Sequence, residues 1–131
     1  MEQVLHFLQD AEFFYVATNE DGQPRVRPFN TVCEYNGKIY ISTSKDKEVF
    51  NQLINNPRIE ISAELERSFL RLSALAILDK DPKAKQKMID DNYRSLLKLY
   101  PNGNENVVVF ALSDVKGSIY NEGNEVTEFN F

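Results

Sequence analysis

An Asn-Gly pair at positions 36 and 37 lies between two apolar runs and constrains the fold of this chain more than any other feature. A type I′ turn needs positive φ at both central residues, and asparagine and glycine tolerate that conformation best. The runs on either side are therefore predicted to be antiparallel strands joined by a tight hairpin. The strand after the turn ends in Ser42, Thr43 and Ser44.

The segment before the turn, residues 24–35, is predicted to be paired on both sides. An aromatic and β-branched run at 13–18 precedes it, and the sequence Asn-Glu-Asp-Gly at 19–22 is a turn signal between the two. A three-stranded meander is therefore expected. Pro24 and Pro28 have no N–H to donate, which predicts that the middle segment is bulged or meets something other than a neighbouring strand.

The rest of the chain supplies more short strands and a few helices. Alternating or continuous apolar runs predict strands at 59–65, 69–78, 107–112, 116–121 and 126–131. Helical spacing predicts helices at 2–10, from about Lys47, and after Asp81-Pro82 with an interruption near Asp91-Asn92. Six or seven short strands with inserted helices favour one mainly β (α+β) domain over residues 1–131, built as a small antiparallel barrel.

The strand at 69–78 is apolar on both faces. Leu70, Leu72 and Ala74 share one face, while Leu75 and Ile77 lie on the other. A strand of this kind is covered on both sides. The barrel interior is expected on one side, and a helix or a second subunit on the other.

The overall composition excludes several functions. The chain has 131 residues and a formal net charge of -5, which argues against a nucleic-acid partner. A single cysteine, Cys33, excludes a disulfide framework and a multi-cysteine zinc site, and it is expected to be a small buried residue. The N-terminus lacks the pattern of a secretion signal and no window is long enough to span a membrane, so we expect a cytoplasmic protein.

Residues 23–47 carry a pattern typical of a phosphate site. Arg25 and Arg27 are two residues apart and share one face of their strand. The hydroxyl-rich strand end at 42–44 leads into Lys45 and then into a helix, for which Asp46 is the expected N-cap. Guanidinium groups, hydroxyls, an ammonium group and the free N–H groups of a helix start are the chemistry that binds phosphate.

Motifs for other chemistry are missing. There is no Gly-rich dinucleotide fingerprint and no P-loop. The only histidine, His6, falls in the first predicted helix, and no pair of carboxylates stands out as a general acid and base. A catalytic role would therefore need a bound cofactor.

Several segments together resemble a known family. They are Phe14-Tyr-Val-Ala-Thr18, Asp21-Gly-Gln-Pro-Arg-Val-Arg-Pro-Phe29, Lys38-Ile-Tyr-Ile-Ser-Thr43, Lys47 and Asn56-Pro57. The pattern is similar to the pyridoxamine 5′-phosphate oxidase-like FMN-binding split barrels, especially the short nitroimidazole-resistance-type proteins. The resemblance extends through Phe69-Leu-Arg-Leu-Ser to the C-terminal strands. It implies a six-stranded antiparallel split barrel and a homodimer with two FMN molecules in the subunit interface.

The resemblance also implies which residues contact the cofactor. Arg27 would contact the FMN phosphate or the ribityl chain, Lys47 would be the second phosphate cation, and Arg25 is the second arginine on the same face. Hydroxyl and backbone donors would come from Ser42, Thr43 and Ser44, the backbone of Pro28, Phe29 and Asn30 would border the ring, and Phe69 would lie near the partner's flavin. Each candidate also has a plain structural alternative: a solvated strand face for the arginines, a helix surface for Lys47, and a core or interface aromatic for Phe69.

Two departures bear on the reaction. The chain ends in Glu128-Phe-Asn-Phe131 and not in a basic tail that would hold pyridoxal phosphate, and Val32 stands near the position of an expected substrate lysine. Oxidation of pyridoxamine phosphate is therefore not expected. Three hypotheses remain: an FMN-dependent oxidoreductase that passes electrons from a reduced nicotinamide to a nitro compound or quinone, a non-enzymatic FMN carrier or sensor, and a split barrel with deazaflavin, heme or no cofactor.

Overall fold

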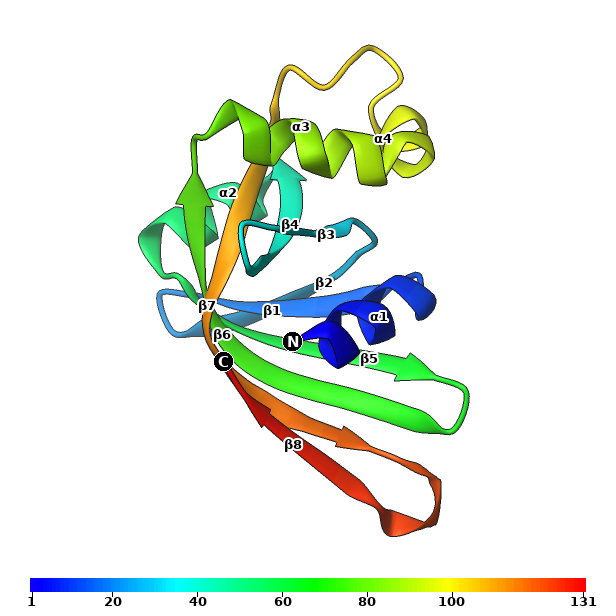
Figure 1. Ribbon diagram of the computed structural model, residues 1–131. Helices are drawn as coiled ribbons and strands as arrows, with labels where there is room; N and C mark the ends of the chain where they lie inside the picture. The colour runs from blue at the N-terminus through cyan, green and yellow to red at the C-terminus, as the bar shows by residue number, and fades with distance from the viewer.

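The computed structural model describes residues 1–131 as eight strands and four helices around one sheet (Figure 1). The strands are β1 (Phe14–Glu20), β2 (Gln23–Phe29), β3 (Val32–Tyr35), β4 (Lys38–Ser44), β5 (Arg58–Leu65), β6 (Ser68–Asp79), β7 (Val107–Tyr120) and β8 (Val126–Asn130). The helices are α1 (Glu2–Asp10), α2 (Glu48–Asn55), α3 (Pro82–Asp91) and α4 (Tyr93–Leu99), with a short 3₁₀ turn at Glu122–Asn124.

The sheet divides at its longest strand, β7. The strand order is β2-β1-β5-β6-β7-β4-β3, and β8 also pairs with β7. The first part of β7 pairs with β4 and its last part pairs with β8, while β6 runs along its other edge. All of the pairings are antiparallel. The split-barrel prediction is confirmed, although the sheet has eight strands and not six.

The predicted three-stranded meander is wrong. Segment 24–35 breaks at Asn30 and Thr31 into β2 and β3, which lie at opposite ends of the sheet order. The expected bulge is also absent, because β2 pairs with β1 without interruption and places Pro24 opposite Asn19. The prolines are tolerated because β2 is an edge strand, where a missing N–H costs no ladder bond on the open side.

Segments 107–112 and 116–121, predicted as two strands, form the single strand β7. The chain is irregular between them but does not break: Asp114 has a φ of 50°, and the register with β6 shifts between Ser73 and Leu75. Such a bulge bends a strand and increases its twist while pairing continues on both sides.

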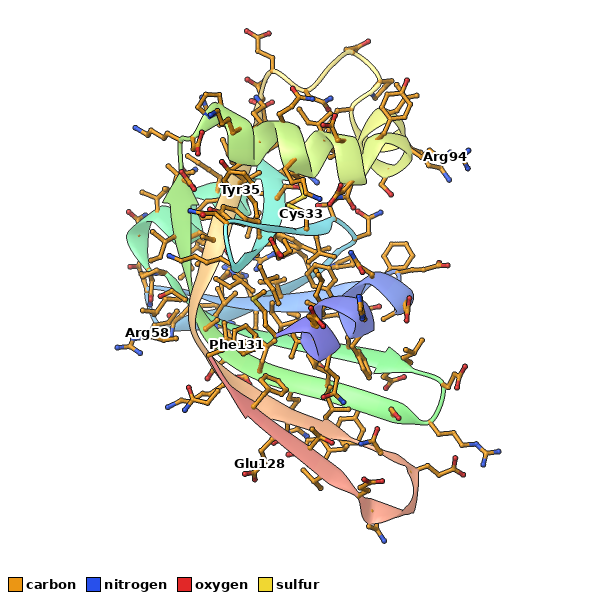
Figure 2. All side chains as sticks on the ribbon, in the orientation of Figure 1. Cys33, Tyr35, Arg58, Arg94, Glu128 and Phe131 are labelled. Carbon is orange, nitrogen blue, oxygen red and sulfur yellow. The ribbon has the colours of Figure 1, made fainter.

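Two apolar clusters hold the fold together. The larger lies inside the barrel and includes residues of α1, α2 and the inward faces of β1, β4, β5, β6 and β7. The smaller packs α3 and α4 against the outer faces of β3, β4 and β7, and Cys33 lies fully buried within it (Figure 2). Burial raises the pKa of the Cys33 thiol to about 12, so this residue packs as a small apolar group, as expected.

The helices begin where the sequence predicts, and only the predicted N-cap of α2 is wrong. The Asp81 carboxylate accepts a hydrogen bond from the Lys83 backbone N–H and caps α3. Asp46 does not cap α2, because Lys47 occupies the N-cap position and the Asp46 carboxylate accepts instead from the Asn106 side chain at 2.9 Å. None of the helices combines the length and the apolar character needed to cross a bilayer.

Candidate functional site

A cavity of about 240 Å³ lies where the end of β2, the end of β4, the start of α2 and the end of α4 meet. It is lined by Phe13, Arg27, Pro28, Phe29, Asn30, Thr31, Ser42, Thr43, Lys47, Val49, Leu96, Leu99 and Tyr100. Seven of the ten residues predicted from the sequence as cofactor contacts are in this set. The fold therefore brings the ends of β2 and β4 together at one cavity, although these two strands are not neighbours in the sheet.

Arg27 supplies one cation to the lining of this cavity. Its guanidinium donates to the Val16 carbonyl at 3.1 Å, to the Thr18 hydroxyl at 2.8 Å and to the side-chain oxygen of Gln52 at 2.5 Å. All three acceptors are neutral, and Arg27 takes part in none of the ion pairs of the chain. Burial, with the nearby charge of Arg25, lowers the pKa of Arg27, as expected for a cation that no carboxylate contacts.

Lys47 supplies a second cation at the start of α2. Its ammonium group lies 5.6 Å from the centre of the Tyr100 ring, within range of a cation–π interaction. The N-terminus of α2 adds the partial positive charge of its unpaired N–H groups. Two cations and a helix start therefore face one cavity, an arrangement suited to an anion.

Hydroxyl groups and apolar side chains complete the lining. Ser42 and Thr43 are buried at the end of β4, and the Ser42 hydroxyl is hydrogen-bonded to that of Thr31 at 2.5 Å. The apolar part of the lining, called here the apolar wall, comes from Phe13, Phe29, Val49, Leu96, Leu99 and Tyr100. A molecule that carries both a phosphate and a flat, largely apolar ring matches these types of side chain.

Three predicted residues do not line the cavity. Arg25 is exposed and forms an ion pair with Glu20 at 3.2 Å. Ser44 is buried, and its hydroxyl accepts a hydrogen bond from the Asp46 backbone N–H. Phe69 stacks on Tyr120 with ring centres 4.5 Å apart. Its expected place is near the flavin of a partner subunit, and that role stays a prediction.

Sequence reasoning missed the residues that surround Arg27 and the wall made by α4. Thr18 and Gln52 hold the guanidinium, and Leu96, Leu99 and Tyr100 line the cavity. The one available signal was Gln52, a polar residue three positions after Val49 on the apolar face of its helix. A buried polar group on such a face requires a partner.

The model of the pyridoxamine 5′-phosphate oxidase family matches residues 1–118 of this chain. The chain belongs to that family. It is similar to the solved structure of a NimC/NimA family protein from Clostridium acetobutylicum, with 34% identity and a TM-score of 0.91. That match covers 100% of this chain and 92% of the other, in agreement with the resemblance to nitroimidazole-resistance-type proteins.

More distant solved structures share the fold alone. An FMN-binding, pyridoxamine 5′-phosphate oxidase-related protein from Nostoc punctiforme has 15% identity and a TM-score of 0.64 over 99% of this chain and 93% of its own. The heme storage protein HutZ from Vibrio cholerae has 17% identity and a TM-score of 0.63 over 86% and 87% of the two chains. A comparison with curated proteins gave no match.

Proposed function

We propose that this protein binds FMN in the cavity between β2, β4, α2 and α4, with the phosphate between Arg27 and Lys47. The observation that carries the proposal is the partly buried Arg27 guanidinium, whose hydrogen-bond partners are all neutral. A partly desolvated cation without a counter-ion is costly, and a bound phosphate would supply the missing negative charge. Family membership and the fold shared with an FMN-binding protein support this choice.

Each part of the lining has a role in this proposal. Arg27, Lys47 and the α2 N-terminus would bind the phosphate, with Ser42 and Thr43 as further donors. The backbone of Pro28, Phe29 and Asn30 would border the edge of the flavin ring, and the apolar wall would contact its face. We therefore expect the protein to bind FMN more tightly than riboflavin, because riboflavin lacks the phosphate that the cations bind.

Heme and deazaflavin are the competing cofactors, and HutZ shows that a heme protein can share the fold. The cavity lining includes no histidine, methionine or cysteine, and Tyr100 is its one side chain of a type that ligates heme iron. This scarcity of iron ligands favours a flavin over heme. The visible spectrum of the purified protein distinguishes these cofactors directly.

We further propose that the protein is an FMN-dependent oxidoreductase that takes electrons from a reduced nicotinamide and passes them to a nitro compound or quinone. A bound flavin would supply the electron-transfer chemistry itself. The chain would contribute position and electrostatics, since the cavity lining includes no histidine and no carboxylate to act as acid or base. Broad acceptor specificity is expected, because an apolar wall discriminates weakly among planar molecules.

Stopped-flow spectroscopy tests the oxidoreductase role. The FMN-loaded protein, reduced by NADPH under anaerobic conditions, is mixed with a nitroimidazole or with menadione, and the visible flavin absorbance is followed. We expect rapid return of the oxidised spectrum with both acceptors. A reduced spectrum that persists with every acceptor would leave the carrier or sensor role in its place.

We also propose that the protein is a homodimer with the flavin in the subunit interface. The cavity of one chain, about 240 Å³, is smaller than the roughly 300–1,000 Å³ of typical ligand sites. Large apolar side chains also remain exposed on three strands of the sheet, with exposed fractions of 50% for Tyr15, 67% for Val26 and 46% for Ile77. Sedimentation at micromolar concentration is expected to show a dimer. A stable folded monomer contradicts both the dimer and the interface position.

A further inference from the structure

Gln52 lies behind Arg27 and contacts it directly. Only 3% of this α2 residue is exposed, and its side chain lines no part of the cavity. Its amide oxygen accepts hydrogen bonds from the Arg27 guanidinium and from the Thr18 hydroxyl, both at 2.5 Å. Two donors meeting at one atom fix which end of the amide is oxygen, because an NH₂ group cannot accept these bonds.

The neutrality of Gln52 has a consequence for the charge of Arg27. Glutamate has the same shape and would also accept both hydrogen bonds, but it would neutralise the guanidinium from behind. The nearest acidic residues, Glu20 and Glu48, raise the pKa of Arg27 only as secondary influences, after its burial and the charge of Arg25. The direct contacts therefore hold the guanidinium in place and leave its charge uncompensated.

Glu20 is held away from Arg27 by its own contacts. One carboxylate oxygen of Glu20 pairs with Arg25 at 3.2 Å, and the other accepts a long bond of 3.4 Å from the Gln52 NH₂ group. Gln52 thus separates a carboxylate from a guanidinium and presents the matching polar atom to each. The outer arginine is paired, and the inner one stays free for an anion.

We propose that Gln52 is a positioning residue that determines the anion selectivity of the site, because it orients Arg27 while leaving its charge available to a phosphate. This proposal rests on the function proposed above. It assigns the preference for a phosphorylated cofactor to a residue that does not contact the cofactor. The preference should therefore weaken when a carboxylate takes the place of this amide, with every cavity-lining residue unchanged.

The test compares FMN and riboflavin affinity in four proteins: wild type, Gln52→Glu, Glu20→Gln and the double variant with both changes. The double variant keeps the wild-type net charge and moves one carboxylate from Arg25 to Arg27. Dissociation constants come from quenching of flavin fluorescence. We expect Gln52→Glu and the double variant to lose about tenfold to hundredfold in FMN affinity, the range of one charge-assisted contact, with riboflavin affinity unchanged. Glu20→Gln should keep the wild-type preference.

Gln52→Met separates charge from packing. It removes the contact with Arg27 but adds no charge, so its loss of FMN affinity should be smaller than that of Gln52→Glu. A structural role alone would reverse this order, because methionine loses both hydrogen bonds and glutamate keeps them. Unfolding of both glutamate variants, or full FMN preference in either, overturns the proposal. Equal affinity of wild type for FMN and riboflavin is a different result, and it contradicts the proposed phosphate site itself.

Discussion

Replacing Arg27 and Lys47 together by alanine is expected to lower FMN affinity by about two to four orders of magnitude. Each charge-assisted contact to a phosphate contributes roughly 1.5–3 kcal/mol, which corresponds to about tenfold to hundredfold in affinity, and the two effects add if the residues act independently. Riboflavin affinity should change little. The measurement is a fluorescence titration of both ligands against wild type, each single variant and the pair.

Arg25→Ala is the matched control for this experiment. Arg25 shares β2 and its face with Arg27, but it is exposed, pairs with Glu20 and lines no part of the cavity. We expect its FMN affinity to stay within about fivefold of wild type, since an exposed pair contributes only roughly 0–1 kcal/mol. Equal losses in Arg25→Ala and Arg27→Ala would mean that general positive charge, and not the Arg27 guanidinium in the cavity, attracts the phosphate.

Local signals in the sequence predicted the turns and most helix starts correctly. Asn36 and Gly37 have φ values of 52° and 77°, as a type I′ turn requires, and Asp81 caps α3. These features depend on a few adjacent residues, which a sequence pattern shows directly. The separation of β2 from β3 depends on pairing between distant strands. A continuous extended run at 24–35 contains no sign of which neighbours its two halves will find.

Distance along the chain also explains which residues of the site the sequence predicted and which it did not. Arg27, Ser42, Thr43 and Lys47 fall within 21 residues of sequence, so their pattern was visible before their positions were known. The apolar wall of α4 follows about fifty residues later, and nothing in its helical spacing links it to Arg27. Folding brings it there because α4 packs on the outer face of the sheet with Leu96 buried.

Gly117→Ala is expected to be the most destabilising small substitution on β7. A Cβ atom at this position would lie 2.0 Å from the Arg71 carbonyl oxygen and 2.7 Å from the Leu72 Cα, and both are backbone atoms of the paired strand β6. Neither can rotate away, so the strands would have to separate near the bulge after Ser73. We expect a loss of about 3 kcal/mol or more in the free energy of unfolding, or a fall of about 10 °C in Tm.

Gly123→Ala separates this steric effect from the general cost of replacing a glycine. Gly123 has a φ of 83°, which disfavours alanine, but a Cβ atom there would meet nothing within 4 Å. Its expected cost is about 1 kcal/mol, which is the backbone term alone. Thermal and urea unfolding of both variants give the comparison. If the free energy of unfolding falls no more in Gly117→Ala than in Gly123→Ala, then β6 and β7 can separate at little cost. The close contact of their backbones would then not constrain the sheet where it divides.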